Sequence, residues 1–177
     1  MSAILLLPSL LPLALIKPQT GLPIILINLT WRRLLALVMF ISLAFIVYPG
    51  WPLAWYAQAK NYDGVIPLLA LPLGPLMLLA LLKWREKDMR FLFLMACVPQ
   101  RALYDLTPLY LLPKSLRQML AACFLSWAAF VPLLAANYYW GSPPRQVFLS
   151  LAFVYLPLLA MQFIPTLAAK LNRAEGA

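Results

Sequence analysis

Apolar runs recur along nearly the whole chain, and this pattern constrains its fold more than any other feature. Hydrophobic residues make up 64% of the 177 and charged residues 11%, whereas an ordinary soluble domain is about 25% charged. A water-soluble fold would have no polar surface left, so the sequence predicts an all-α, polytopic integral membrane bundle that forms one domain over 1–177. The eight runs lie at 2–16, 21–31, 34–49, 65–82, 91–100, 103–112, 118–136 and 146–165.

The lengths of the runs separate full spans from shorter helices. A hydrocarbon core of about 30 Å requires roughly 20 helical residues, and four runs are long enough, or nearly so, to cross it. The runs at 21–31, 91–100 and 103–112 reach only about half way. We expect these to be membrane-dipping half-helices that other parts of the protein cover. The 17 prolines also predict broken helices.

Basic residues indicate the topology, because cytoplasmic loops carry an excess of Lys and Arg. If 4–30 and 91–113 are each one continuous span, the basic residues split seven against five. If all eight runs change side, they split ten against four. We favour this second arrangement, with both termini cytoplasmic in a bacterial inner (plasma) membrane. The side with ten then holds Arg32, Arg33, Lys83, Arg85, Lys87, Arg90, Lys114, Arg117, Lys170 and Arg173.

Several chemistries lack the residues that they need. The chain has no histidine, two cysteines and five acidic residues, so we expect no metal centre, no cofactor and no histidine-based triad. The basic residues occur in small clusters between apolar runs, which argues against a nucleic-acid partner. The charged stretch at 83–90 is expected to be a solvated cytoplasmic loop that touches anionic lipid.

Two proline-marked turns place charge where lipid makes it costly. They are Lys17-Pro18-Gln19 and Pro99-Gln100-Arg101, and the second is followed by Tyr104-Asp105. A charged side chain near the bilayer centre costs about 2.5–3.5 kcal/mol, so such residues normally face a cavity or a partner. Both turns face the outer side in the favoured topology. The candidate substrate-binding residues are Lys17, Gln19, Gln100, Arg101, Tyr104 and Asp105, and the catalytic residue is unknown.

Each candidate has a structural and a functional interpretation. In the structural one, Arg101 pairs with Asp105 four residues later, Lys17 extends to the headgroups, and the two glutamines bond neighbouring carbonyls. In the functional one, Lys17 and Arg101 converge on an anion, with Tyr104 and Asp105 completing the wall. Cationic donors suit phosphate, and a lipid-linked phosphate is the obvious anionic substrate in a membrane.

At these turns the sequence resembles the GT-C glycosyltransferases that use polyprenyl-phosphate sugar donors, in particular glycosyltransferase family 87. Lys17-Pro18-Gln19, the 21–31 run and Trp31-Arg32-Arg33 look like the family's Lys-Pro-Gln turn, short helix and Arg-rich loop. The stretch from Pro99 through Tyr104-Asp105 is similar to a second family motif, and the aromatic stretch from Trp51 to Tyr56 also fits. The resemblance covers roughly residues 10–135.

The resemblance implies hexosyl or mannosyl transfer at the extracytoplasmic face. Lys17 and Arg101 would hold the donor phosphate, while Tyr104 and Asp105 orient the sugar or Arg101. It also implies a catalytic acid in a first outer loop, which nothing before Lys17 matches. We therefore expect the C-terminal portion of a longer enzyme, or a reduced homologue that binds the carrier without transfer. A non-catalytic membrane subunit and a transporter remain alternatives.

Overall fold

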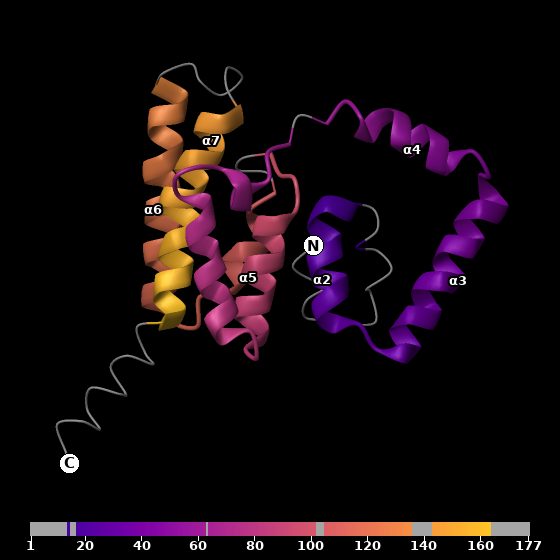
Figure 1. The fold of residues 1–177 in the computed structure, drawn as a ribbon, viewed down its shortest axis with the longest axis horizontal. Helices are drawn as coiled ribbons and strands as arrows, with labels where there is room; N and C mark the ends of the chain where they lie inside the picture. Colours follow the sequence, from indigo (N-terminus) through magenta and orange to yellow (C-terminus); the bar gives the residue numbers. More distant parts are fainter. Residues whose placement is uncertain (1–13, 15–16, 63, 102–104, 136–142, 164–177) are drawn as a thin grey trace, which may run out of the picture. The chain divides into compact units, whose positions relative to one another are not determined.

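The structure is a computed structural model that describes residues 14, 17–62, 64–101, 105–135 and 143–163 (Figure 1). Its elements are helices, and the described residues contain no β-strand, only an isolated antiparallel bridge between Val65 and Gln100. The all-α class predicted from the sequence is confirmed. The chain divides into two units, residues 1–64 and residues 65–177.

The first unit contains three helices: α2 (Pro18–Asn28), α3 (Trp31–Val47) and α4 (Trp51–Ala59). The 11 residues of α2 span about 16 Å, which confirms the half-length helix expected near 21–31. The axes of α3 and α4 meet at 101°. This bend falls on Tyr48-Pro49-Gly50, where Pro49 supplies no backbone donor to continue the helix.

Apolar side chains of α3 are largely exposed. In α3 only Leu37 is buried, whereas Met39, Ile46 and Val47 are 72%, 77% and 76% exposed. Water-soluble monomers rarely expose a continuous apolar surface of this extent. The surface of α3 is therefore suited to lipid or to another protein rather than to water.

The second unit is built around a long C-terminal helix. That helix is continuous from α7 (Pro143–Ser150) through the π-helical segment η6 (Leu151–Tyr155) to residue 163. Its buried side chains, including Tyr155 and Leu158, share the core with Leu92 and Met95 of α5. The other elements of the unit are η2 (Pro67–Leu69), η3 (Gly74–Lys83), α5 (Lys87–Cys97), η4 (Thr107–Leu111) and α6 (Leu116–Ala135).

The run at 65–82 does not form one membrane-length helix. It forms two short 3₁₀ helices, η2 and η3, separated by a turn that contains Pro72. Pro67 and Pro75 each lie in the first turn of their helix, where a missing N–H is tolerated, whereas a proline inside a helix breaks its hydrogen bonds. The prolines thus divide the 65–82 run, which hydropathy alone predicts to be one segment.

The segment from α5 to α6 is a hairpin. Lys114, after η4, has its Nζ 3.0 Å from Oδ2 of Asp88 in the first turn of α5. A continuous helix would separate these two residues by about 39 Å. The structure therefore excludes a single span over 91–113: α5 is of half length, and by Lys114 the chain has returned to the end where α5 begins.

One helix in the described part of the chain, Gln146–Phe163, is long and apolar enough to cross a membrane by length and composition. The bent pair α3 and α4 would be a second if it is counted as one broken span. These findings are consistent with a membrane-associated protein.

Candidate functional site

Gln100, which is 2% exposed, holds the turn after α5 in place. Its backbone N–H donates to the Val65 carbonyl at 3.0 Å, and its carbonyl accepts the Val65 N–H at 3.1 Å. Its side-chain Nε2 donates to the Met95 carbonyl, while Oε1 accepts the Tyr155 hydroxyl at 2.7 Å. The structural interpretation of Gln100, as a partner for a neighbouring carbonyl, is the one that the structure shows.

Tyr155 joins this turn to the C-terminal helix through its hydrogen bond with Gln100. It is fully buried and lies midway along Gln146–Phe163, the helix of membrane-spanning length. The 11 residues of α5 span about 16 Å, which is about half of a hydrocarbon core. The Tyr155–Gln100 hydrogen bond therefore joins the turn to the middle of the C-terminal helix, and the outward orientation of the turn stays a prediction.

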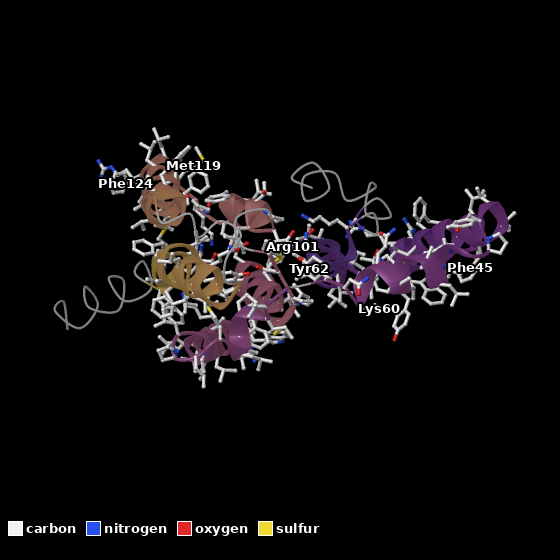
Figure 2. The ribbon with its side chains drawn as sticks, turned by 90° about the horizontal axis from the view of Figure 1, so that it is seen from above. Phe45, Lys60, Tyr62, Arg101, Met119 and Phe124 are labelled. Atoms are coloured by element: carbon white, nitrogen blue, oxygen red, sulfur yellow. The ribbon has the colours of Figure 1, made fainter. Side chains whose placement is uncertain are left out.

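Asp105 fixes the backbone that carries Arg101. Asp105 is 1% exposed, and its Oδ2 accepts the backbone N–H of Arg101 at 2.8 Å. The backbone N–H of Asp105 donates in return to the Arg101 carbonyl at 3.4 Å. The pairing expected from the four-residue spacing thus includes the main chain of Arg101. The Arg101 residue itself is exposed (Figure 2).

Lys17 lies in the first unit, at the N-cap of α2. Its carbonyl accepts the backbone N–H of Gly21 at 2.8 Å, so the Lys-Pro-Gln turn is the start of a helix. The N-terminus of a helix carries partial positive charge, to which the ammonium of Lys17 adds. Lys17 and Arg101 belong to different units, so their convergence stays a prediction. The side chain of Gln19, and all of Tyr104, lie outside the described residues.

Each carboxylate in the described ranges has a partner. Glu86 Oε1 lies 3.3 Å from Lys83 Nζ, Asp88 pairs with Lys114, and Asp105 accepts the Arg101 N–H. Across these ranges there is no group of three or more Cys, Asp or Glu that could hold a metal ion. The carboxylates in the described part of the chain are thus engaged with lysines or with a backbone N–H.

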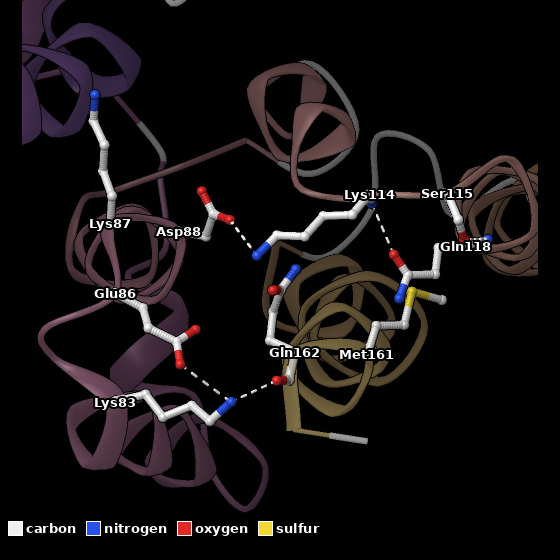
Figure 3. A pocket seen from close by; sticks show the side chains of 9 residues that line it. All are labelled: Lys83, Glu86, Lys87, Asp88, Lys114, Ser115, Gln118, Met161 and Gln162. Atoms are coloured by element: carbon white, nitrogen blue, oxygen red, sulfur yellow. Dashed lines mark hydrogen bonds and ion pairs between the residues drawn. The ribbon is translucent and has the colours of Figure 1, made fainter. Parts of the chain in front are cut away.

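A second polar site lies at the opposite end of α5 from Gln100 (Figure 3). It is a cavity of about 590 Å³ with three lysines and two carboxylates in its wall. The charged residues that line it are Lys83, Glu86, Lys87, Asp88 and Lys114. We name it the basic pocket.

The stretch at 83–90, expected to be a solvated loop, contains an exposed turn at 84–86 and helical residues on either side of it. Lys83 ends η3 with its side chain only 12% exposed, and α5 begins at Lys87. The Lys83–Glu86 spacing of three residues could have indicated that ion pair from the sequence. Lys114 could not have been assigned to the same site, because its proximity to Asp88 arises only when the hairpin closes.

No protein-family model, curated protein or solved structure matches the chain. The resemblance to glycosyltransferase family 87 accordingly rests on the short motifs described above, from Lys17-Pro18-Gln19 to Trp31-Arg32-Arg33, from Pro99 to Tyr104-Asp105, and at Trp51 to Tyr56.

Proposed function

We propose that the chain is a multi-pass integral membrane protein similar to the carrier-binding part of a polyprenyl-phosphate-dependent glycosyltransferase. The observation that carries the proposal is the Tyr155–Gln100 hydrogen bond, which holds the Arg101 turn level with the middle of Gln146–Phe163. An arginine at that depth in a membrane costs about 2.5–3.5 kcal/mol unless it faces a cavity or a counter-charge. A phosphate on a lipid tail is an anion that can reach it from within the bilayer.

The side chains around the turn have separate roles in this proposal. The Arg101 guanidinium is a planar fork that matches two phosphate oxygens. Gln100 and Asp105 are positioning residues, because their polar atoms hold the backbone of the turn. Lys17, at the positive end of α2, is the second donor to the phosphate. Tyr104 orients the sugar.

Electrostatic stabilisation is the chemical contribution of the two cations. When the bond between the sugar carbon and the phosphate oxygen breaks, the leaving phosphate gains negative charge. Lys17 and Arg101 would stabilise that charge more strongly where water is excluded. The base that activates the acceptor of the hexosyl or mannosyl group lies beyond the carboxylates described above.

We expect Arg101→Ala to weaken binding of farnesyl phosphate, a short polyprenyl phosphate, at least tenfold, since a charge-assisted bidentate contact is lost. Binding is measured by native mass spectrometry of the full chain in mild detergent. Arg101→Lys should retain part of the affinity, and Arg117→Ala, an exposed arginine of α6, should leave it unchanged. Equal binding by wild type and Arg101→Ala would refute the proposed contact.

The multi-pass topology makes a separate prediction. Arg85 and Arg117 are exposed and flank the hairpin on either side in the sequence. Because Lys114 returns to Asp88, cysteines introduced at positions 85 and 117 in a chain without Cys97 and Cys123 should be labelled from the same side of the membrane by an impermeant maleimide. Labelling from opposite sides would contradict the hairpin.

A non-catalytic membrane subunit is the second candidate function. The observation that favours it is that Glu86, Asp88 and Asp105 are all engaged in ion pairs or hydrogen bonds. Purification in mild detergent separates the two candidates. A stoichiometric partner chain and no sugar release from a polyprenyl-phosphate donor would favour the subunit, whereas a solitary chain with bound carrier would favour the glycosyltransferase-like protein.

A further inference from the structure

We infer that the basic pocket is a second anion site, which binds the phosphate monoester group of a ligand at the membrane surface. It is distinct from the Arg101 turn, from which it is separated by the length of α5. Its volume of about 590 Å³ lies within the range of ordinary ligand pockets, about 300–1,000 Å³. The site needs no part of the first unit, because all its lining residues lie between 83 and 162.

Four segments bring the pocket together. Lys83, at the end of η3, donates from Nζ to the Gln162 carbonyl at 2.7 Å and lies 4.9 Å from the centre of the Phe163 ring. Gln162 Nε2 in turn donates to the Leu112 carbonyl at 3.1 Å. These bonds tie the ends of η3 and of the C-terminal helix to each other and to the end of η4, so the walls of the pocket are fixed by contacts other than those a ligand would use.

The charges facing the pocket favour an anion. The lining contains three lysines and two carboxylates, which leaves a net positive charge. The Lys114 side chain is 62% exposed, and its ion pair with Asp88 occupies one of the three ammonium protons. Lys87 is the first residue of α5, where the partial positive charge of the helix N-terminus adds to its own. In Figure 3 the Lys87 ammonium points away from that of Lys114, and as an exposed side chain it reaches a phosphate at the pocket by a change of rotamer, which leaves Lys83 undisturbed.

The position of the pocket indicates where the phosphate comes from. Met161 and Gln162 line it from the last turn of Gln146–Phe163, the helix long enough to cross a membrane. The end of such a helix lies near the headgroup level, where lipid phosphates are found. In the favoured topology this is the cytoplasmic surface. A lipid phosphate and a free phosphorylated molecule share the chemistry that the pocket recognises.

The test measures binding of dioctanoyl phosphatidic acid and of inorganic phosphate to the full chain in mild detergent by isothermal titration calorimetry. Lys87→Gln removes one cation and leaves the Lys83–Glu86 and Lys114–Asp88 ion pairs intact, so it should weaken binding about tenfold. Asp88→Asn removes the carboxylate that competes for Lys114 and should tighten binding severalfold. Arg117→Gln, an exposed cation of α6 outside the pocket lining, should change affinity less than about twofold.

Weaker binding by Lys87→Gln together with tighter binding by Asp88→Asn supports the site, because misfolding does not tighten binding. If only phosphatidic acid follows the pattern, the ligand is a lipid; if inorganic phosphate follows it equally, the ligand is a free phosphorylated molecule. Affinities unchanged in both variants, or lowered as much by Arg117→Gln as by Lys87→Gln, would overturn the inference. Farnesyl phosphate is also a phosphate monoester, so native mass spectrometry should show two bound copies, of which Arg101→Ala removes one and Lys87→Gln the other; this site and the Arg101 contact can therefore fail independently.

Discussion

Gln100→Ala should lower the free energy of unfolding by about 3 kcal/mol, because it combines a cavity with two unsatisfied polar groups. Gln100 is 2% exposed, and its side chain satisfies the Tyr155 hydroxyl and the Met95 carbonyl. Truncation leaves the fully buried Tyr155 hydroxyl without its acceptor. It also loosens the link between the end of α5 and the C-terminal helix. Titration with a denaturing detergent, followed by circular dichroism, measures the change.

Tyr155→Phe is the matched variant for this hydrogen bond. It removes only the hydroxyl and keeps the ring packed, so we expect a loss of about 1 kcal/mol. The double variant should be less destabilised than the sum of the two single variants, because both remove the same bond. Full additivity would show that the two side chains do not interact. Gln58→Ala, at an exposed position of α4, serves as the control and should change stability by less than about 0.5 kcal/mol.

Gly74→Ala should lower the free energy of unfolding by about 2 kcal/mol, since the added methyl group meets backbone on the neighbouring turn. A Cβ on Gly74 would lie 2.3 Å from the Pro67 carbonyl oxygen and 2.6 Å from that of Leu68. Neither atom belongs to a flexible side chain, so η2 and η3 must move apart. The same denaturing-detergent titration detects the loss.

Gly50→Ala is the control for the glycine substitution. A Cβ on Gly50 would find its nearest neighbour, Cε2 of Tyr48, at 3.5 Å, and its φ of −79° suits any L residue. We expect no loss of stability, or a small gain from the stiffer unfolded chain. If both alanine variants behaved alike, close packing of η3 on η2 would not be the reason for glycine at position 74.

Residue type and spacing identified polar residues of the candidate site but not the role of each one. Both Gln100 and Asp105 were identifiable as polar residues at a costly position, but spacing alone could not separate a ligand contact from a structural role. The distinction depends on Tyr155, which is 55 residues from Gln100 in the chain and has no local signal that pairs it with the turn. The spacing of four residues predicted that Asp105 pairs with the Arg101 side chain, whereas the bond in the structure is to the Arg101 backbone N–H.

The amino-acid sequence by itself determined the all-α class, the half-length helices near 21–31 and 91–100, and the clustering of basic residues between apolar runs. These properties follow from composition and from proline positions, which act over a few residues. Only the tertiary structure decided that Lys114 returns to Asp88, that the Arg101 turn lies level with the middle of the C-terminal helix, and that η2 and η3 replace one span. Each of the first two depends on a contact between residues far apart in the chain, which forms only once the surrounding helices have packed.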